Sequence, residues 1–265
     1  MGFSTYVKKI SATTLVALTV AACAVSPTGR HQFLALSPAE LDQMGEAAYQ
    51  KIKSETPISN NAKQKRYIQC IANNVTAVSG SNDNWETTLF EDKSVNAFAL
   101  PGGKIGIYTG LLNVATNQHQ VAAVMGHEVG HVIAQHSNER MSIEYASQSG
   151  LQIVSSILGG NGGSSEALVG LLGVGAQFGV SLPFSRKHET EADIIGLELM
   201  AKAGFDPRES VKLWQNMAKA GGSGGPEFMS THPGHETRIR NLQQHIPKVM
   251  PLYEQAKAQG RRPQC

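Results

Sequence analysis

Two histidines four residues apart constrain the fold of this chain more than any other feature of its sequence. They lie in the stretch VMGHEVGH at residues 124–131, and on a helix both His127 and His131 project from one face. The surrounding residues are apolar, and two buried imidazoles without a metal or a hydrogen-bond partner would cost free energy. Glu128 is rotated by about 100° from His127, which places its carboxylate beside a metal held by both rings. We therefore predict a buried helix that binds a divalent metal, and zinc is the usual ion for this spacing.

A metal that takes part in chemistry needs a third protein ligand and one open coordination position. His136 follows His127 by nine residues, about 180° around a straight helix, so we expect it at the surface or in a second layer around the site. Ala134 and Ser137 occupy the positions where the metzincin pattern needs glycine and histidine, which excludes that pattern. The remaining candidate is a carboxylate from a second helix.

The stretch HETEAD supplies that carboxylate. Glu189 and Asp193 share one helix face, with Glu189 as the ligand and Asp193 as the acceptor that orients a metal-bound histidine. Glu191 is rotated by about 200° from Glu189 and cannot share this role. Ala192 and Gly196 are small enough to let the two helices approach closely. The alternative interpretation is an exposed acidic turn at a helix N-terminus.

The ordered motifs resemble a known family. HEVGH at residues 127–131, followed by SRKHETEAD at 185–193, is similar to the zinc metallopeptidases of the HtpX and CAAX-prenyl-protease type (family M-forty-eight), particularly their periplasmic lipoprotein LoiP/BepA/Oma-like group. Three further segments match the family pattern, namely NAFALPGG at 96–103 with the following GLL, AGFDP at 203–207, and STHP at 230–233 with the arginine of RIR after it. The resemblance runs from about Ser37 to His245.

This resemblance implies a zinc endopeptidase with one Zn²⁺ held by His127, His131 and Glu189. It implies that Glu128, as general base, activates a zinc-bound water for attack on the peptide carbonyl, and that Asp193 orients a histidine ligand. The implied substrates are unfolded or misassembled proteins of the cell envelope.

The roles of His232 and Arg238 each have two possible interpretations. The family's C-terminal histidine corresponds to His232, which in some members fills the open zinc position in a self-inhibited form. Arg238 corresponds to a residue that stabilises the oxyanion. The residues alone equally allow His232 as a hydrogen-bonded residue of a rigid loop before Pro233, and Arg238 as a buried salt bridge. A self-inhibited or non-proteolytic, chaperone-like zinc-binding lipoprotein is therefore the alternative function.

The expected fold class is α+β and mainly helical, a gluzincin-like zincin domain with a small antiparallel or mixed β-sheet beside the HExxH helix. Strands are expected at 85–90, 95–100 and 104–109. Helices are expected at 37–53, from 61 onward, 118–147, 185–203, from about 206 onward, and over a short final stretch at 237–245. We expect the substrate backbone to pair with an edge strand formed by Lys104, Ile105, Gly106, Ile107 and Tyr108. The Gly-rich segment 150–182 is a lid, an interfacial helix pair or ordinary packed helices.

The N-terminal leader predicts export. Residues 1–22 contain a basic segment, an apolar stretch too short to span a membrane and small residues, the three-part form of a signal peptide. Its end, VAAC, resembles the bacterial lipobox, which implies acylation of Cys23, a lipid-anchored tether over 23–36 and a peptidase domain over 37–265. Because Ala24 is not aspartate, the resemblance favours the periplasmic face of the outer membrane. A plain secretory signal is the alternative.

The cysteine count and the net charge indicate whether the protein can form a disulfide and whether it can bind nucleic acid. With Cys23 acylated, Cys70 and Cys265 form an even pair that an oxidising compartment allows to bond, although two free thiols are the alternative. The chain has 23 basic and 21 acidic residues, and without the leader's Lys8 and Lys9 the two counts are equal. The chain therefore lacks the excess of basic residues expected of a protein that binds nucleic acid. Outer-membrane assembly proteins are candidate partners, but the stretch after His245 is too short for the repeat domain of BepA-like members.

Overall fold

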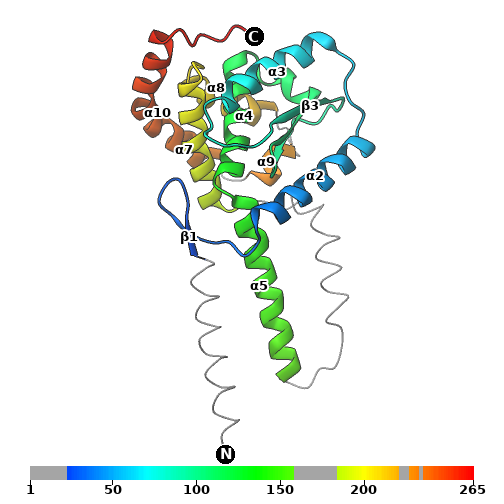
Figure 1. Cartoon of the computed structure of the whole chain (residues 1–265). Helices are drawn as coiled ribbons and strands as arrows, with labels where there is room; N and C mark the ends of the chain where they lie inside the picture. Colours follow the sequence, from blue (N-terminus) through cyan, green and yellow to red (C-terminus); the bar gives the residue numbers. More distant parts are fainter. Residues whose placement is uncertain (1–22, 158–183, 221–226, 233–234) are drawn as a thin grey trace, which may run out of the picture.

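The computed structural model describes residues 23–157, 184–220, 227–232 and 235–265 (Figure 1). The predicted signal peptide and most of the segment 150–182 lie outside these residues. The chain is mainly helical with two small sheets, which confirms the predicted fold class. The elements in chain order are β1 (Cys23–Val25), β2 (His31–Phe33), α2 (Pro38–Glu55), α3 (Ala62–Thr76), β3 (Glu86–Phe90), β4 (Ala97–Leu100), β5 (Lys104–Tyr108), the 3₁₀ turn η1 (Thr109–Asn113), α4 (Gln118–Ile133), α5 (His136–Ile157), α7 (Arg186–Lys202), α8 (Glu209–Ala220), α9 (Glu227–Thr231) and α10 (His235–Ala258).

The larger sheet has the strand order β3-β5-β4 and mixed pairing. β5 runs parallel to β3, with Glu86 opposite Lys104, and antiparallel to β4, with Leu100 opposite Lys104. The predicted substrate strand therefore needs correction. Both backbone edges of β5 are already hydrogen-bonded, so Lys104 to Tyr108 cannot accept another strand. The prediction was wrong because residue types along a half-buried strand do not reveal which strand is central.

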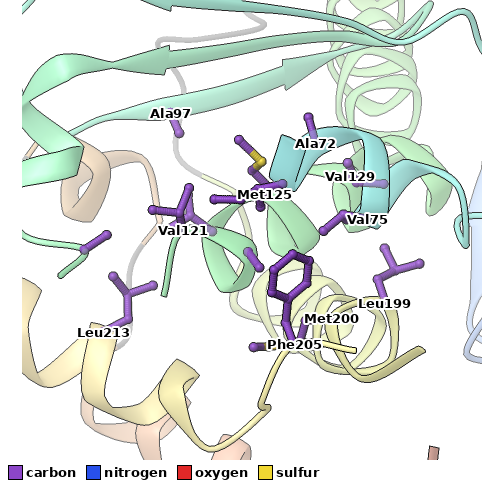
Figure 2. Packing of buried hydrophobic residues seen from close by; sticks show 14 of the residues in the cluster. Ala72, Val75, Ala97, Val121, Met125, Val129, Leu199, Met200, Phe205 and Leu213 are labelled. Atoms are coloured by element: carbon purple, nitrogen blue, oxygen red, sulfur yellow. The ribbon is translucent and has the colours of Figure 1, made fainter. Parts of the chain in front are cut away.

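Helix α4 lies at the centre of the core because its apolar residues point in all directions rather than along one stripe. Figure 2 shows Met125 of α4 between Ala97 of the sheet and Phe205, which follows α7. Val121 and Val129 of the same helix pack against residues of α8, α3 and α7. The helix that carries HEVGH is thus held on several sides, which fixes its rotation.

Small residues set the distance between α4 and α7, as the sequence predicted. A Cβ atom on Gly196 would lie 2.8 Å from the backbone nitrogen of His127, and one on Gly126 would lie 2.9 Å from the carbonyl oxygen of Gly196. A Cβ atom on Gly130 would lie 3.0 Å from the carbonyl oxygen of Ala192. Larger side chains at this crossing would push the two helices apart, and with them the residues of the metal centre.

A break after α4 divides the single long helix expected over 118–147. α4 ends at Ile133 and α5 begins at His136, because Gln135 adopts a left-handed backbone conformation with φ of 52°. The Gln32 side-chain amide donates a hydrogen bond of 2.6 Å to the carbonyl oxygen of Ala134, one of the carbonyls that the end of α4 leaves free. The change of direction turns His136 back toward α4.

The N-terminal residues of the described chain do not form a separate tether. β1 and β2 pair antiparallel, Cys23 opposite Phe33, and the Ser26 N–H donates to the Arg30 carbonyl oxygen at 2.8 Å to close the hairpin. Ser26 and Gln32 are buried against the domain. The tether predicted over 23–36 is therefore corrected. Residues 23–33 are part of the folded domain, because their polar side chains find buried partners there.

The final helix is longer than the predicted stretch 237–245. α10 contains two prolines and continues through both to Ala258. Each proline lacks the backbone donor that a helix interior normally uses. Burial keeps α10 helical, since Leu242, Val249 and Ala256 form a buried stripe at intervals of seven residues. Within the described ranges, no helix is both long enough and apolar enough to cross a membrane.

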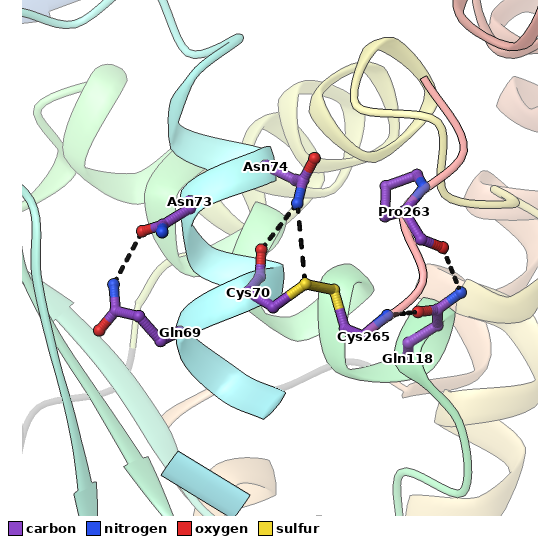
Figure 3. The surroundings of a disulfide bond; sticks show 7 residues. All are labelled: Gln69, Cys70, Asn73, Asn74, Gln118, Pro263 and Cys265. Atoms are coloured by element: carbon purple, nitrogen blue, oxygen red, sulfur yellow. Dashed lines mark hydrogen bonds between the residues drawn. A yellow bond between two sulfur atoms is a disulfide. The ribbon is translucent and has the colours of Figure 1, made fainter. Parts of the chain in front are cut away.

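A disulfide joins α3 to the C-terminal segment (Figure 3). The sulfur atoms of Cys70 and Cys265 lie 2.06 Å apart and the Cα atoms 5.6 Å apart. Gln118, at the start of α4, receives a hydrogen bond from the Cys265 N–H and donates one to the Pro263 carbonyl oxygen, both at 2.8 Å. The segment after α10 is thereby fixed across α3 and α4.

Candidate metal centre

Four buried side chains converge at the crossing of α4 and α7. One ligand atom from each of His127, His131, Glu189 and His232 lies within 4.8 Å of all the others. The Nε2 atoms of His127 and His131 are 3.0 Å apart, and the Glu189 carboxylate oxygens lie 3.5 and 3.4 Å from them. α4 supplies the two histidines, the first turn of α7 supplies the glutamate, and the residue after α9 supplies the fourth group. Two imidazole nitrogens and a carboxylate are the donor set of a catalytic zinc site.

Glu128 lies beside this cluster without belonging to it. Its Oε1 atom is 3.4 Å from His232 Nε2, is buried and forms no hydrogen bond among the described residues. Burial raises the pKa of Glu128 above its ordinary value, although the Ala99 backbone N–H of β4 donates to its carboxylate. A buried, free carboxylate oxygen facing the cluster suits a group that takes a proton from a water molecule.

His127 is supported by a carboxylate and an arginine. Its Nδ1 atom lies 3.0 Å from Asp193 Oδ1, four residues after Glu189 on α7. Burial and the Arg238 guanidinium each lower the pKa of His127, but the interactions with Asp193 and Glu189 outweigh them and raise it to about 9. The structure thus brings Asp193 to the position where the sequence places a histidine-orienting residue.

Arg238 of α10 forms a buried ion pair behind the ligands. Its Nε and Nη2 atoms donate to the two oxygens of Asp193 at 2.8 and 2.6 Å, and Nη1 lies 2.5 Å from Glu189 Oε2. The guanidinium also lies 3.8 Å above the Trp214 ring. This is the salt bridge that the residues alone left as the alternative to an oxyanion role. It holds the pKa of Asp193 below its ordinary value, against the effect of burial.

His232 occupies the fourth side of the cluster. Its Nδ1 atom lies 3.0 Å from Glu189 Oε1 and 3.2 Å from His127 Nε2, while its ring stacks on Phe228 at 4.3 Å. Burial raises the pKa of Glu189, but His232 and Arg238 outweigh it and hold that pKa well below its ordinary value. With His232 in this place, all four groups around the centre come from the protein.

The surroundings of His131 contain His136, for which the sequence left two positions open, the surface or a second layer around the site. It lies in the second layer and is fully buried, with its Nδ1 atom 2.9 Å from His131 Nδ1. Its Nε2 atom lies 3.1 Å from Glu191 Oε2. No glycine or proline marks the break at Gln135 that turns it inward. The one signal in the sequence that could have indicated this second layer was the presence of histidines and glutamates in the segments that contain His136 and Glu191.

Fold and site together define a zincin-like domain of the HExxH class. The family model described as Peptidase family M48 matches residues 61–246. Mitochondrial metalloendopeptidase OMA1 of Schizosaccharomyces pombe is 36% identical over 213 residues, which cover 78% of this chain and 61% of that protein. The chain therefore belongs to peptidase family M48.

Two further relatives extend the comparison. Metalloendopeptidase OMA1, mitochondrial, of Homo sapiens is 31% identical over 233 residues, covering 85% of this chain and 44% of that protein. Beta-barrel assembly-enhancing protease of Escherichia coli is 25% identical over 221 residues, covering 81% and 45%. The chain thus spans 44–61% of the length of these three relatives.

Proposed function

We propose that the protein is a zinc endopeptidase that cleaves unfolded or misassembled proteins of the cell envelope. The observation that supports this most is the convergence of His127, His131 and Glu189 with a buried, free carboxylate oxygen of Glu128 beside them. A site that only stabilised the fold would not need that carboxylate. Membership of a peptidase family agrees with the proposal.

Zinc held by these ligands would supply a Lewis acid and lower the pKa of a water molecule toward about 7. Glu128 would take the proton from that water and pass it to the leaving amine. Its raised pKa makes it a stronger base than an exposed glutamate. Asp193 and Arg238 would hold His127 and Glu189 in place during the reaction.

The substrate would be read mainly through its backbone. Among the described residues, β4 pairs only with β5, so its other edge has no strand partner. Ala99 of that strand already contacts Glu128, which places this edge beside the reacting groups. Main-chain pairing there would give broad sequence preference, as suits unfolded substrates.

The location belongs to the same proposal. The leader and VAAC at residues 20–23 support a lipid anchor on Cys23 at the periplasmic face of the outer membrane. The relatives' names do not agree on a location, since one names mitochondria and another β-barrel assembly. The proposed location therefore rests on the leader sequence. Outer-membrane assembly proteins are the proposed partners. The mass of the mature N-terminal peptide tests the anchor, and an unmodified Cys23 would contradict it.

The test of the activity compares purified wild type with Glu128→Gln in the degradation of casein, with zinc measured in both proteins. We expect the variant to retain zinc and lose at least about 100-fold in rate, the usual contribution of a positioned base. Equal rates would remove Glu128 as the base. Zinc bound by both proteins without cleavage by either would favour the chaperone-like alternative or a closed site.

A closed site is the second candidate, and the position of His232 is the observation that favours it. A zinc ion held by all four groups would have no open position for a water. Replacing His232 with alanine should raise basal cleavage several-fold. His245→Ala should not, because among the described residues the His245 ring is hydrogen-bonded to the Asn241 carbonyl within α10 and to no residue of the centre. Unchanged or lower cleavage in His232→Ala would contradict the closed state.

A further inference from the structure

A second buried cluster lies next to the metal centre, on the side of His131. It contains two histidines, two glutamates and one arginine, and these residues come from three parts of the chain, namely Arg30 of the hairpin, His136 and Glu139 of α5, and His188 and Glu191 of α7. Arg30 joins the two carboxylates, with its Nε 2.8 Å from Glu191 and its Nη atoms 2.6 Å from Glu139. The proposed reaction assigns no role to this cluster, and of its members only His188 and Glu191 lie within a stretch that carries the family resemblance.

One path of hydrogen bonds through this cluster ends on the metal centre. If His131 binds a metal through Nε2, its neutral ring carries the proton on Nδ1. His136 Nδ1 is 2.9 Å away, and only one of the two nitrogens can carry a proton, so His131 donates and His136 accepts. His136 then carries its own proton on Nε2 and donates it to Glu191 at 3.1 Å.

The hairpin completes this path. Glu191 also accepts from Arg30 Nε at 2.8 Å and from the Thr28 hydroxyl at 2.6 Å, so its carboxylate stays fixed and ionised. The opposite tautomer of His136 would turn a lone pair toward that carboxylate, which is repulsive. Every proton position from Arg30 to His131 is therefore determined by the next group along the path.

We infer that His136, Glu191 and Arg30 are positioning residues for the metal ligand His131, and that the N-terminal hairpin is thereby part of the metal centre. Gln32 adds a second link from the same hairpin, because its amide holds the Ala134 carbonyl at the end of α4, three residues after His131. The inference rests on the proposed zinc site, and it predicts that hairpin changes alter zinc affinity without touching a ligand.

The other half of the cluster provides a matched control. Glu139 binds Arg30 and accepts from His188 Nε2 at 3.1 Å, just as Glu191 binds Arg30 and accepts from His136. The His136 and His188 rings stack with their centres 4.4 Å apart, but only His136 is hydrogen-bonded to a metal ligand. The two pairs share the Arg30 contact but differ in their connection to His131, and Glu139 also accepts from the Gln32 amide at 3.1 Å.

The experiment measures the zinc dissociation constant of the full chain by chelator competition and records the visible spectrum of the cobalt-substituted protein. We expect His136→Phe and Glu191→Gln to weaken zinc binding about 10- to 100-fold and to change the cobalt spectrum, the usual cost of losing a ligand's hydrogen-bond partner. His188→Phe should change the dissociation constant less than about 2-fold, because the His188 ring is hydrogen-bonded to Glu139 and not to a ligand. Glu139→Gln should weaken binding less than Glu191→Gln, because Glu139 is connected to His131 only through Arg30 and Gln32. Circular dichroism of the metal-free proteins confirms that all four are folded.

Arg30→Met tests the hairpin itself, with Arg208→Met as control, because the exposed Arg208 side chain forms its ion pair with Asp206, outside the cluster and the metal centre. We expect weaker zinc binding in the first variant and wild-type binding in the second. Equal losses in both halves of the cluster, or wild-type affinity in His136→Phe and Glu191→Gln, would overturn the inference while leaving the zinc site intact. Absence of zinc binding by the wild type would instead remove the proposed function and this inference together.

Discussion

The two histidines of the metal centre are supported by different sets of residues. Asp193 and Arg238 support His127, and both come from long helices packed in the core. His136 and Glu191 support His131, and they depend on Arg30 in a hairpin of two three-residue strands at the edge of the domain. One support therefore lies within the core, whereas the other also relies on a hairpin whose residues 27–29 are exposed.

The sharpest test of this difference combines one substitution from each side. Asp193→Asn and His136→Phe should each weaken zinc binding about 10- to 100-fold, and together about 10²- to 10⁴-fold if the two supports act independently. Chelator competition measures all three dissociation constants. If the double variant binds zinc no more weakly than the weaker-binding of the two single variants, the supports act as one network. That result would contradict the distinction drawn between them.

The close contact between α4 and α7 underlies both supports. Gly196→Ala places a Cβ atom 2.8 Å from the backbone nitrogen of His127, so one helix has to shift. We expect a loss of about 1–3 kcal/mol in the free energy of unfolding and weaker zinc binding. Urea denaturation of the metal-free protein measures the first effect. Wild-type stability would mean that the helices separate at little cost.

The smallest expected effect concerns the hairpin side and depends on pH. Burial raises the pKa of Glu139, but hydrogen bonds from Arg30 and Gln32 outweigh it and hold that pKa below its ordinary value. Because the folded state then favours the ionised form, Glu139→Gln should cost about 1–2 kcal/mol at pH 7. The difference from wild type should fade as pH falls below about 4.3, where the unfolded carboxyl takes up its proton and the stabilisation is lost.

Urea denaturation of the metal-free proteins at several pH values measures this dependence. Glu55→Gln serves as the control, since Glu55 is exposed and lies 3.9 Å from Lys51 at the end of α2. Exposed pairs contribute little, so this variant should stay within a few tenths of a kcal/mol of wild type. A Glu139→Gln penalty as large at pH 3 as at pH 7 would contradict a charge-based role for the hairpin cluster.

Helical periodicity was sufficient to predict Asp193 beside His127, whereas Arg238 came from the family resemblance and its salt bridge was one of two alternatives. Glu189 and Asp193 lie four residues apart on α7, as His127 and His131 do on α4, and small residues between the helices indicate close packing. Such patterns are local, so they survive without knowledge of the tertiary structure.

The side of His131 depends on contacts between distant segments. His136 faces the centre only because Gln135 takes a positive φ, and Gln32 of the hairpin is bound at that break. Arg30 and Glu191 are separated by 161 residues. The order of strands in the larger sheet and the continuation of α10 beyond His245 are likewise decided by packing, and no local pattern specifies them.

The disulfide described above also sets an order in time. Cys70 precedes Cys265 by 195 residues, so when an exported chain enters an oxidising compartment with its N-terminal end first, the proper partner of Cys70 arrives last. The chain has three cysteines, and during that interval Cys23 is the one thiol with which Cys70 could pair wrongly. Acylation of Cys23, which the leader predicts, would remove that competitor, so a modification that attaches the protein to a membrane would also leave a single pairing for its disulfide.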